Sequence, residues 1–231
     1  MIYLTGDTHR EFGRVGAFCD KFESTPDDTL IILGDAGINY CGRDQDVQFK
    51  RMLADNLPIT IFCIHGNHEM RPESCGTYKE AEWHGGMVYR EPEFLTLLFA
   101  KDGEIYDFGG KKCIAIGGAY SVDKYYRLSR DLGWWADELP SAEIKQRVGQ
   151  RLDAVNWQVD IVLSHTCPKK YIPTEMFLPG IDQSAVDNSA EEWLDTIDDK
   201  LTCGRWYCGH WHTSKTIDRM RFMFKDYLGL T

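Results

Sequence analysis

Short apolar runs, each closed by a glycine or a polar residue, recur along this chain of 231 residues and predict buried β-strands. The clearest runs cover residues 2–4, 29–33, 59–64, 160–163 and 205–208. Shorter strands are predicted at 87–89, 96–98, 104–106 and 112–116, and a closing hairpin is predicted from 215–217 and 222–224. None of these runs is long enough to span a bilayer as a helix.

Apolar residues at helical spacing predict helices over 11–22, 44–56, 141–155 and 190–201. Ser141 is expected to cap the third helix, because its hydroxyl can accept a hydrogen bond from the first turn. The order of elements predicts an α/β layered sandwich of two sheets with helices outside. We expect residues 1–231 to form a single domain, because α/β units often exceed roughly 200 residues.

Each of the five clearest strands is followed at once by Asp, Asn or His. The five segments are Gly6-Asp7-Thr8-His9, Gly34-Asp35, His65-Gly66-Asn67-His68-Glu69, Ser164-His165 and Gly209-His210-Trp211-His212. A lone Asp-x-His or a lone His after a strand is common by chance. The loops that leave the carboxyl ends of strands form the site in sheets of this type, so we expect these segments to meet.

The residue types point to metal chemistry. Asp and His together suit Mn, Fe, Zn, Co or Ni, and the absence of Cys from the set argues against a structural zinc site. Asp7 and His9 lie on the same side of an extended segment, as do His210 and His212, so each pair can face one ion. The carboxylate of Asp35 has two oxygens and can bridge two ions about 3.5–4 Å apart, an arrangement that activates water against a phosphoryl group.

Together, from residue 7 to residue 212, these motifs resemble the calcineurin-like metallophosphoesterase superfamily, in particular its small bacterial and phage members. The resemblance implies a four-layer αββα sandwich of two mixed sheets with flanking helices. It implies a first metal ion held by Asp7, His9, Asp35 and His212, and a second held by Asp35, Asn67, His165 and His210. Asp35 and His68 would be the catalytic residues, with His68 the general acid or a charge stabiliser beside the scissile group. Glu69 would orient the loop.

The chain also departs from one branch of that superfamily. In serine/threonine phosphoprotein phosphatases, Gly-Asp continues as x-x-Asp-Arg-Gly, whereas Ile38 and Asn39 stand at those positions here. His84 copies the His-Gly-Gly of that branch's lone metal histidine. We favour His165 for this role, because an apolar strand precedes it and Gly-His-x-His follows it. His65 is expected to support the ligands from behind or to be structural, and His84 is expected to be a loop residue held by its neighbouring glycines.

Substrate contacts are open at the level of sequence. Arg10, Arg71 and Asn39 are candidates, and Arg43 is a rival. Residues 120–135 are rich in aromatic residues, and this pattern has two interpretations. They could form a packed loop with Trp134 and Trp135 in a small core, or a substrate wall built from Tyr125, Tyr126, Arg127 and Arg130.

Composition limits the partners. The 26 Lys and Arg against 36 Asp and Glu give a net charge of −10, which weighs against bulk nucleic-acid or anionic-membrane binding. The eight cysteines are scattered without CxxC spacing and the start of the chain predicts no targeting segment, so we expect a reduced, cytoplasmic protein. Two bound divalent ions would still present a positive centre to a small phosphorylated substrate or a phosphoprotein. The oligomeric state stays open.

The leading hypothesis is a dinuclear metal-dependent phosphoester hydrolase, in which a metal-bridged hydroxide attacks phosphorus in line and His68 assists the leaving group. We expect a phosphodiesterase or a broad-specificity phosphatase that uses two divalent transition-metal ions, from among Mn, Fe, Zn and Ni. Two alternatives are a serine/threonine-type phosphoprotein phosphatase and a non-catalytic metal-binding interaction scaffold. A scaffold would be expected to have lost ligands, whereas all seven are present.

Overall fold

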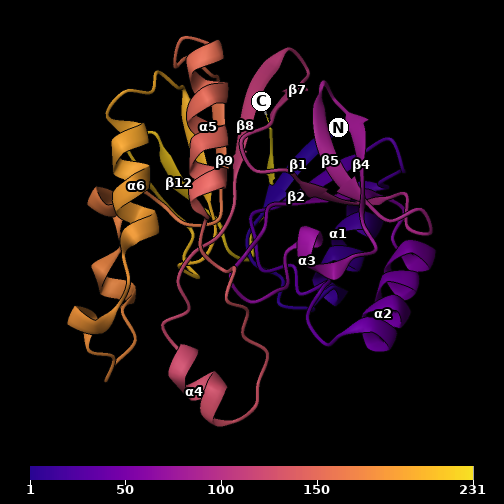
Figure 1. Ribbon diagram of the computed structural model, residues 1–231. Helices are drawn as coiled ribbons and strands as arrows, with labels where there is room; N and C mark the ends of the chain where they lie inside the picture. The colour runs from indigo at the N-terminus through magenta and orange to yellow at the C-terminus, as the bar shows by residue number, and fades with distance from the viewer. Residues whose placement is uncertain (231) are drawn as a thin grey trace.

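Two β-sheets pack face to face, with helices on both outer sides (Figure 1). The computed structural model describes residues 1–230, apart from the side chain of Arg43, so the proposal for that arginine lies outside the described residues. Helices α1 and α2 cover the first sheet, and α5 and α6 cover the second. The predicted α/β sandwich of four layers is confirmed. Within the described part of the chain, no helix is long and apolar enough to cross a membrane.

The first sheet has seven strands in the order β13-β1-β2-β3-β6-β5-β4. In that order they span Leu228–Gly229, Ile2–Thr5, Thr29–Ile32, Thr60–Cys63, Leu97–Ala100, Gly86–Arg90 and Lys79–Trp83. The pairs from β1 through β2 and β3 to β6 are parallel, and antiparallel pairs complete the two edges. The carboxyl ends of β1, β2 and β3 therefore lie at one edge of the molecule.

The second sheet has six strands in the order β11-β12-β10-β9-β8-β7. They span Lys215–Ile217, Met220–Phe222, Arg205–Cys208, Ile161–Ser164, Lys111–Ile116 and Ile105–Phe108. Strands β8, β9, β10 and β12 pair in parallel, and β11 and β12 form the predicted closing hairpin.

Four helices lie where the apolar spacing predicts them: α1 (Gly13–Phe22), α2 (Arg43–Asn56), α5 (Ala142–Ala154) and α6 (Ser189–Asp198). Two short helices, α3 (Pro72–Cys75) and α4 (Lys124–Ser129), were not predicted. Three short 3-10 helices, η1 (Lys169–Tyr171), η2 (Thr174–Met176) and η3 (Gln183–Ala185), lie between β9 and α6. Ser141 caps α5 as predicted, because its hydroxyl accepts a hydrogen bond from the N–H of Ile144 (3.3 Å).

Alternate residues of each central strand face two different cores. In β2, Leu30 and Ile32 pack toward α1 and α2, whereas Ile31 packs between the sheets. Both faces of the strand are covered, which explains why its sequence is a continuous apolar run instead of an alternating one. Phe62 is fully buried between the sheets, and truncating it to Ala would cost about 3–5 kcal/mol.

Strand β4 and helix α4 had no clear sequence signal. Strand β4 is rich in charged residues such as Lys79, Glu80 and Glu82, because it lies at the edge of its sheet and is largely exposed. Helix α4 has no buried residue, so no apolar stripe marks it. It lies in the long connection between β8 and α5, which extends away from the two sheets (Figure 1).

Candidate metal centre

The five predicted loops follow β1, β2, β3, β9 and β10, and the structure brings them together at the carboxyl ends of these strands. Two of the loops carry glycines that leave room for a carboxylate. A Cβ atom added to Gly66 would lie 2.0 Å from Oδ1 of Asp35, and one added to Gly209 would lie 2.2 Å from Oδ1 of Asp7. Each glycine is therefore required by a side chain from another loop.

The same loops hold four of the proposed ligands in left-handed backbone conformations. The φ angles are 45° at His9, 50° at Asp35, 65° at His210 and 48° at His212. This conformation is uncommon for residues other than glycine and tends to cluster at functional sites. These four residues therefore adopt an unfavourable backbone conformation that places their side chains in the site.

Two buried carboxylates lie at the centre of the site, and a backbone amide orients each of them. Oδ1 of Asp7 accepts a hydrogen bond from the N–H of His210 (2.9 Å), and Oδ1 of Asp35 accepts one from the N–H of His68 (2.8 Å). The second oxygen of each carboxylate faces the histidines. Burial raises the pKa of both groups, but His212 beside Asp7 and His165 beside Asp35 outweigh it, so each pKa lies below its usual value.

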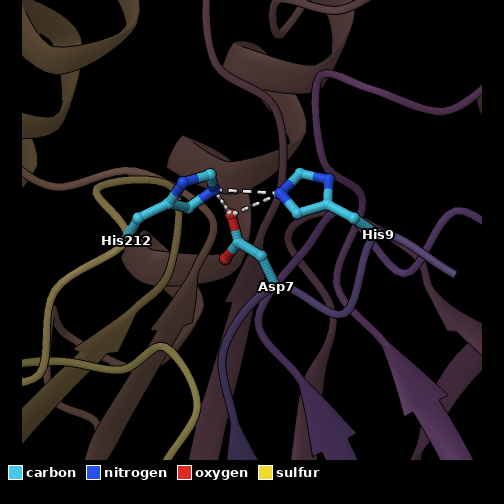
Figure 2. Close-up of side chains that lie close together, drawn as sticks. All are labelled: Asp7, His9 and His212. Carbon is cyan, nitrogen blue, oxygen red and sulfur yellow. Dashed lines mark hydrogen bonds and ion pairs between the residues drawn. The ribbon is translucent and has the colours of Figure 1, made fainter. Parts of the chain in front are cut away.

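One group of donor atoms consists of Asp7, His9 and His212 (Figure 2). The two Nε2 atoms lie 2.9 Å apart, and Oδ2 of Asp7 lies 3.3 Å from His212 Nε2 and 3.7 Å from His9 Nε2. Ligands bound at about 2.0–2.2 Å to one ion lie about 3.0–3.6 Å from one another, which these separations approach. Oδ2 of Asp7 is buried and has no hydrogen-bond partner among the described residues. A cation fits this group.

A second group consists of Asp7, Asp35 and His165. Nε2 of His165 lies 3.6 Å from Oδ2 of Asp35 and 2.9 Å from Oδ1 of Asn67. The other ring nitrogen, Nδ1, lies 2.8 Å from the carbonyl oxygen of Leu33 and must carry the proton, since a carbonyl only accepts. In the neutral ring, which is the form that binds metals, Nε2 presents a lone pair toward the amide oxygen of Asn67, and a cation bound near both acceptors would resolve their repulsion.

His210 lies beside this second group, with its ring centroid 5.0 Å from that of His165. Desolvation lowers the pKa of His210 well below its usual value, and His165 acts in the same direction. The ring is therefore neutral at physiological pH, which is the form that binds metals.

Two adjoining cavities open onto these groups. The larger has a volume of about 440 Å³ and the smaller about 240 Å³, and both are lined by His9, His68 and Arg127. His68 is partly buried, and its ring centroid lies 5.8 Å from that of His9. Burial lowers the pKa of His68, whereas Asp35 opposes this shift. His68 thus lies where the two cavities meet, beside the proposed ligands.

Val122, Asp123 and Arg127 of the 120–135 segment line the larger cavity, and Arg127 also lines the smaller one. The Nε of Arg127 donates to Asp123 (2.8 Å), and its Nη1 donates to the hydroxyl of Tyr40 (3.2 Å). Tyr125 and Tyr126 are 72% and 59% exposed and line neither cavity. Of the four residues proposed as a substrate wall, Arg127 alone lines the two cavities.

The other proposed substrate contacts are placed differently. Arg10 lines the smaller cavity, where its guanidinium stacks on Phe49. Asn39 is buried and accepts a hydrogen bond from the hydroxyl of Tyr78 (3.0 Å). Arg71 is buried in an ion pair with Asp102 (2.7 Å). Neither Asn39 nor Arg71 lines the cavities, so we withdraw both as substrate contacts.

Glu69 lies under the loop that carries Asp35. Its carboxylate accepts hydrogen bonds from the consecutive backbone N–H groups of residues 36, 37 and 38, at 3.0–3.3 Å. Burial raises the pKa of Glu69 to about 8, and the charge of Asp35 acts in the same direction. His65 is buried outside both ligand groups, and the exposed His84 lies at the β4–β5 turn.

The family model for calcineurin-like phosphoesterases matches residues 1–214. The chain belongs to the calcineurin-like phosphoesterase family. It is therefore a hydrolase, and family membership implies metal-dependent hydrolysis of phosphoesters. A search of curated proteins gives no match.

Two solved structures are similar to this phosphoesterase at low identity. Phosphopantetheinyl hydrolase from Mycobacterium tuberculosis is 14% identical with a TM-score of 0.49, over 96% of this chain and 87% of that one. A protein serine/threonine phosphatase from Saccharomyces cerevisiae is 14% identical with a TM-score of 0.34, over 96% of this chain and 66% of that one.

Proposed function

We propose that this phosphoesterase is a dinuclear hydrolase whose whole length, residues 1–231, forms one catalytic unit. The observation that carries the proposal is a pair of donor groups, Asp7-His9-His212 and Asp7-Asp35-His165, that share the buried carboxylate of Asp7. Loops from both sheets contribute donors, so neither sheet could build the site alone. Two bound divalent ions would supply an activated water for in-line attack and would neutralise the phosphoryl oxygens.

The ligands divide between two positions. Asp7, His9, Asp35 and His212 would hold one ion, and Asp35, Asn67, His165 and His210 would hold the other. Oδ2 of Asp35 lies 3.9 Å from His9 Nδ1 and 3.6 Å from His165 Nε2, so this oxygen reaches toward both positions. The Asp and His donor set suits Mn, Fe, Zn or Ni.

His68 is the proposed general acid. It lies where the two cavities meet, so its ring can reach the oxygen that leaves phosphorus. Burial and the nearby Arg127 oppose protonation of the ring, whereas the carboxylate of Asp35 favours it. The imidazolium form donates a hydrogen bond to the leaving oxygen and passes its proton there as negative charge develops, which leaves the ring neutral.

Arg127 and Arg10 are the proposed phosphate contacts. Tyr40 and Asp123 fix the guanidinium of Arg127, while Gly37 and Asp46 fix that of Arg10. Side chains that are already ordered lose little entropy when they bind a phosphoryl oxygen. A guanidinium also matches the geometry of phosphate oxygens better than an ammonium does.

The substrate is proposed to be a small phosphodiester, or a range of small phosphoesters, in preference to a phosphoprotein. Ile38 is fully buried in the core and Asn39 is bound to Tyr78, so neither offers the Asp-Arg pair of phosphoprotein phosphatases. The test compares p-nitrophenyl phosphate with bis(p-nitrophenyl) phosphate, with Mn²⁺ and with a chelator, for the wild type and Asp35→Asn. We expect Mn²⁺-dependent turnover that is higher for the diester and is lost in the variant. Turnover that persists in chelator would contradict the proposal.

A further inference from the structure

One wall of the larger cavity is mainly apolar and comes from the segment that runs from Met176, at the end of η2, to α6. Met176, Leu178, Ile181 and Val186 line the cavity from this segment, as do Phe177, Gln183 and Asn188. Leu178 is 58% exposed and Met176 is 36% exposed. Exposed aliphatic side chains that gather around a concave surface mark a binding site more often than a random surface feature.

We propose that this wall binds an aliphatic group of the phosphoester substrate. The inference rests on the proposed function, because it names the substrate class of the same site. The cavity volume of about 440 Å³ lies within the range of roughly 300–1,000 Å³ that holds drug-sized ligands. The cavity therefore has room for an organic group beyond the phosphoryl group itself.

The apolar surface begins directly beside the metal centre. Trp211 lies between His210 and His212 in the chain and lines the cavity with them. Its ring centroid lies 5.1 Å from that of His210 and 6.3 Å from that of Phe177. A phosphoryl group held at the ions would thus place its ester substituent against Trp211, Phe177 and the aliphatic side chains that follow.

The charges of the segment are turned away from the wall. The described lining residues between 176 and 188 are all uncharged. Asp182 accepts a hydrogen bond from the N–H of Ser184 (3.0 Å), and Asp187 accepts one from the N–H of Ser189 (2.9 Å), so both carboxylates serve local turns. The wall can contribute van der Waals contacts and can bury apolar surface of a substrate. It provides no ionic partner for a substrate charge.

The wall suits an alkyl chain better than a planar base. Phe177 and Trp211 pack against each other at an interplanar angle of 37° and leave no parallel slot between them. The side chains of Met176, Leu178 and Ile181 are flexible or branched aliphatic groups that can adapt along a chain. An alkyl phosphoester fits both features.

The test measures binding and not turnover. Methyl-, butyl- and octylphosphonate are titrated calorimetrically into Mn²⁺-loaded protein, since their carbon–phosphorus bond resists hydrolysis. Each buried methylene is expected to tighten binding by about threefold to fourfold, so butylphosphonate should bind at least about tenfold more tightly than methylphosphonate. Affinities of the three phosphonates within twofold of one another would overturn the inference.

The variants locate the effect. Leu178→Ser and the double variant Leu178→Ser/Ile181→Ser should flatten the chain-length series and leave methylphosphonate affinity unchanged. Leu95→Ser is the matched control, because Leu95 is 60% exposed and lies outside the cavity. Equal flattening in this control would contradict the assignment to the wall, and unchanged melting temperatures would show that the variants fold.

The failures of the two proposals are distinguishable. Metal-dependent turnover of bis(p-nitrophenyl) phosphate, with phosphonate affinities that do not depend on chain length, would overturn the alkyl-binding wall alone. Phosphonate affinities that rise with chain length, without turnover of either chromogenic ester, would overturn the proposed hydrolysis and support the wall.

Discussion

Nε2 of His165 lies 2.9 Å from Oδ1 of Asn67, and in the neutral ring that binds a metal both atoms are acceptors. The carbonyl of Leu33 fixes the ring through Nδ1, and the hydroxyl of Ser121 fixes the amide by accepting from Asn67 Nδ2 (2.9 Å). A bound cation would stabilise two acceptors held this close. It would also stabilise Oδ2 of Asp7, which is buried without a hydrogen-bond partner among the described residues. Metal binding should therefore stabilise the fold.

Chelator treatment should lower the melting temperature, and added Mn²⁺ should restore it. Binding to the folded state alone contributes about 2.7 kcal/mol at a hundredfold excess over Kd. Thermal unfolding with and without Mn²⁺ measures the shift. His165→Gln should lose most of it, whereas His84→Gln should keep it, because His84 lies on an exposed turn. An unchanged melting temperature in the wild type would refute the prediction.

Gly66→Ala should release metal. The added Cβ would lie 2.0 Å from Oδ1 and 2.2 Å from the backbone nitrogen of Asp35, so both the carboxylate and the loop that carries it would have to shift. Elemental analysis should find less than half of the wild-type metal content. Gly149→Ala is the control: it meets nothing within 4 Å on α5 and should gain up to about 1 kcal/mol of stability. Full metal content in Gly66→Ala would show that the loop can shift without loss.

His68→Ala should keep its metal and lose turnover. A positioned general acid contributes about 10²–10⁴-fold, and the loss should be greatest for alkyl leaving groups, which need a proton most. Steady-state kinetics on an aryl and an alkyl phosphoester, with metal content measured in parallel, check both parts. An alkyl phosphoester hydrolysed at the wild-type rate by this variant would remove His68 from the mechanism.

Arg127→Ala should raise KM by about tenfold or more, since hydrogen bonds to charged groups are worth about 1.5–3 kcal/mol. Arg130→Ala is the matched control in the same connection between β8 and α5. The Arg130 guanidinium stacks on the exposed Tyr126 and lines neither cavity. Initial rates over a range of substrate concentrations separate KM from kcat. Equal effects of the two substitutions would indicate a general charge effect instead of a contact.

The sequence predicted the central fold well for a physical reason. Strands such as β2 and β3 are buried on both faces, so their residues form continuous apolar runs that mark them plainly. Strand β4 is exposed at an edge and α4 has no buried face, so neither element leaves such a pattern. Elements that build the core were therefore predictable, and elements that lie outside it were not.

The sequence predicted the proposed ligands of the site, but it did not predict the residues around them. The proposed ligands follow directly from strand ends, and topology brings strand ends together. Asn39 and Arg71 are close to ligands in sequence, but their side chains turn into buried contacts with Tyr78 and Asp102. The aliphatic wall went unnoticed because Leu178 and its neighbours lie in an irregular segment, where apolar residues show no periodicity.

The most direct test of the two-ion centre is a calorimetric titration of Mn²⁺ into chelator-treated protein, with hydrolysis of bis(p-nitrophenyl) phosphate followed on the same samples. We expect two equivalents to bind per chain, with activity rising as the second site fills. Asp35→Asn should bind less metal and stay inactive throughout. Full activity at one equivalent, or two equivalents bound by Asp35→Asn, would contradict a centre in which Asp35 serves both ions.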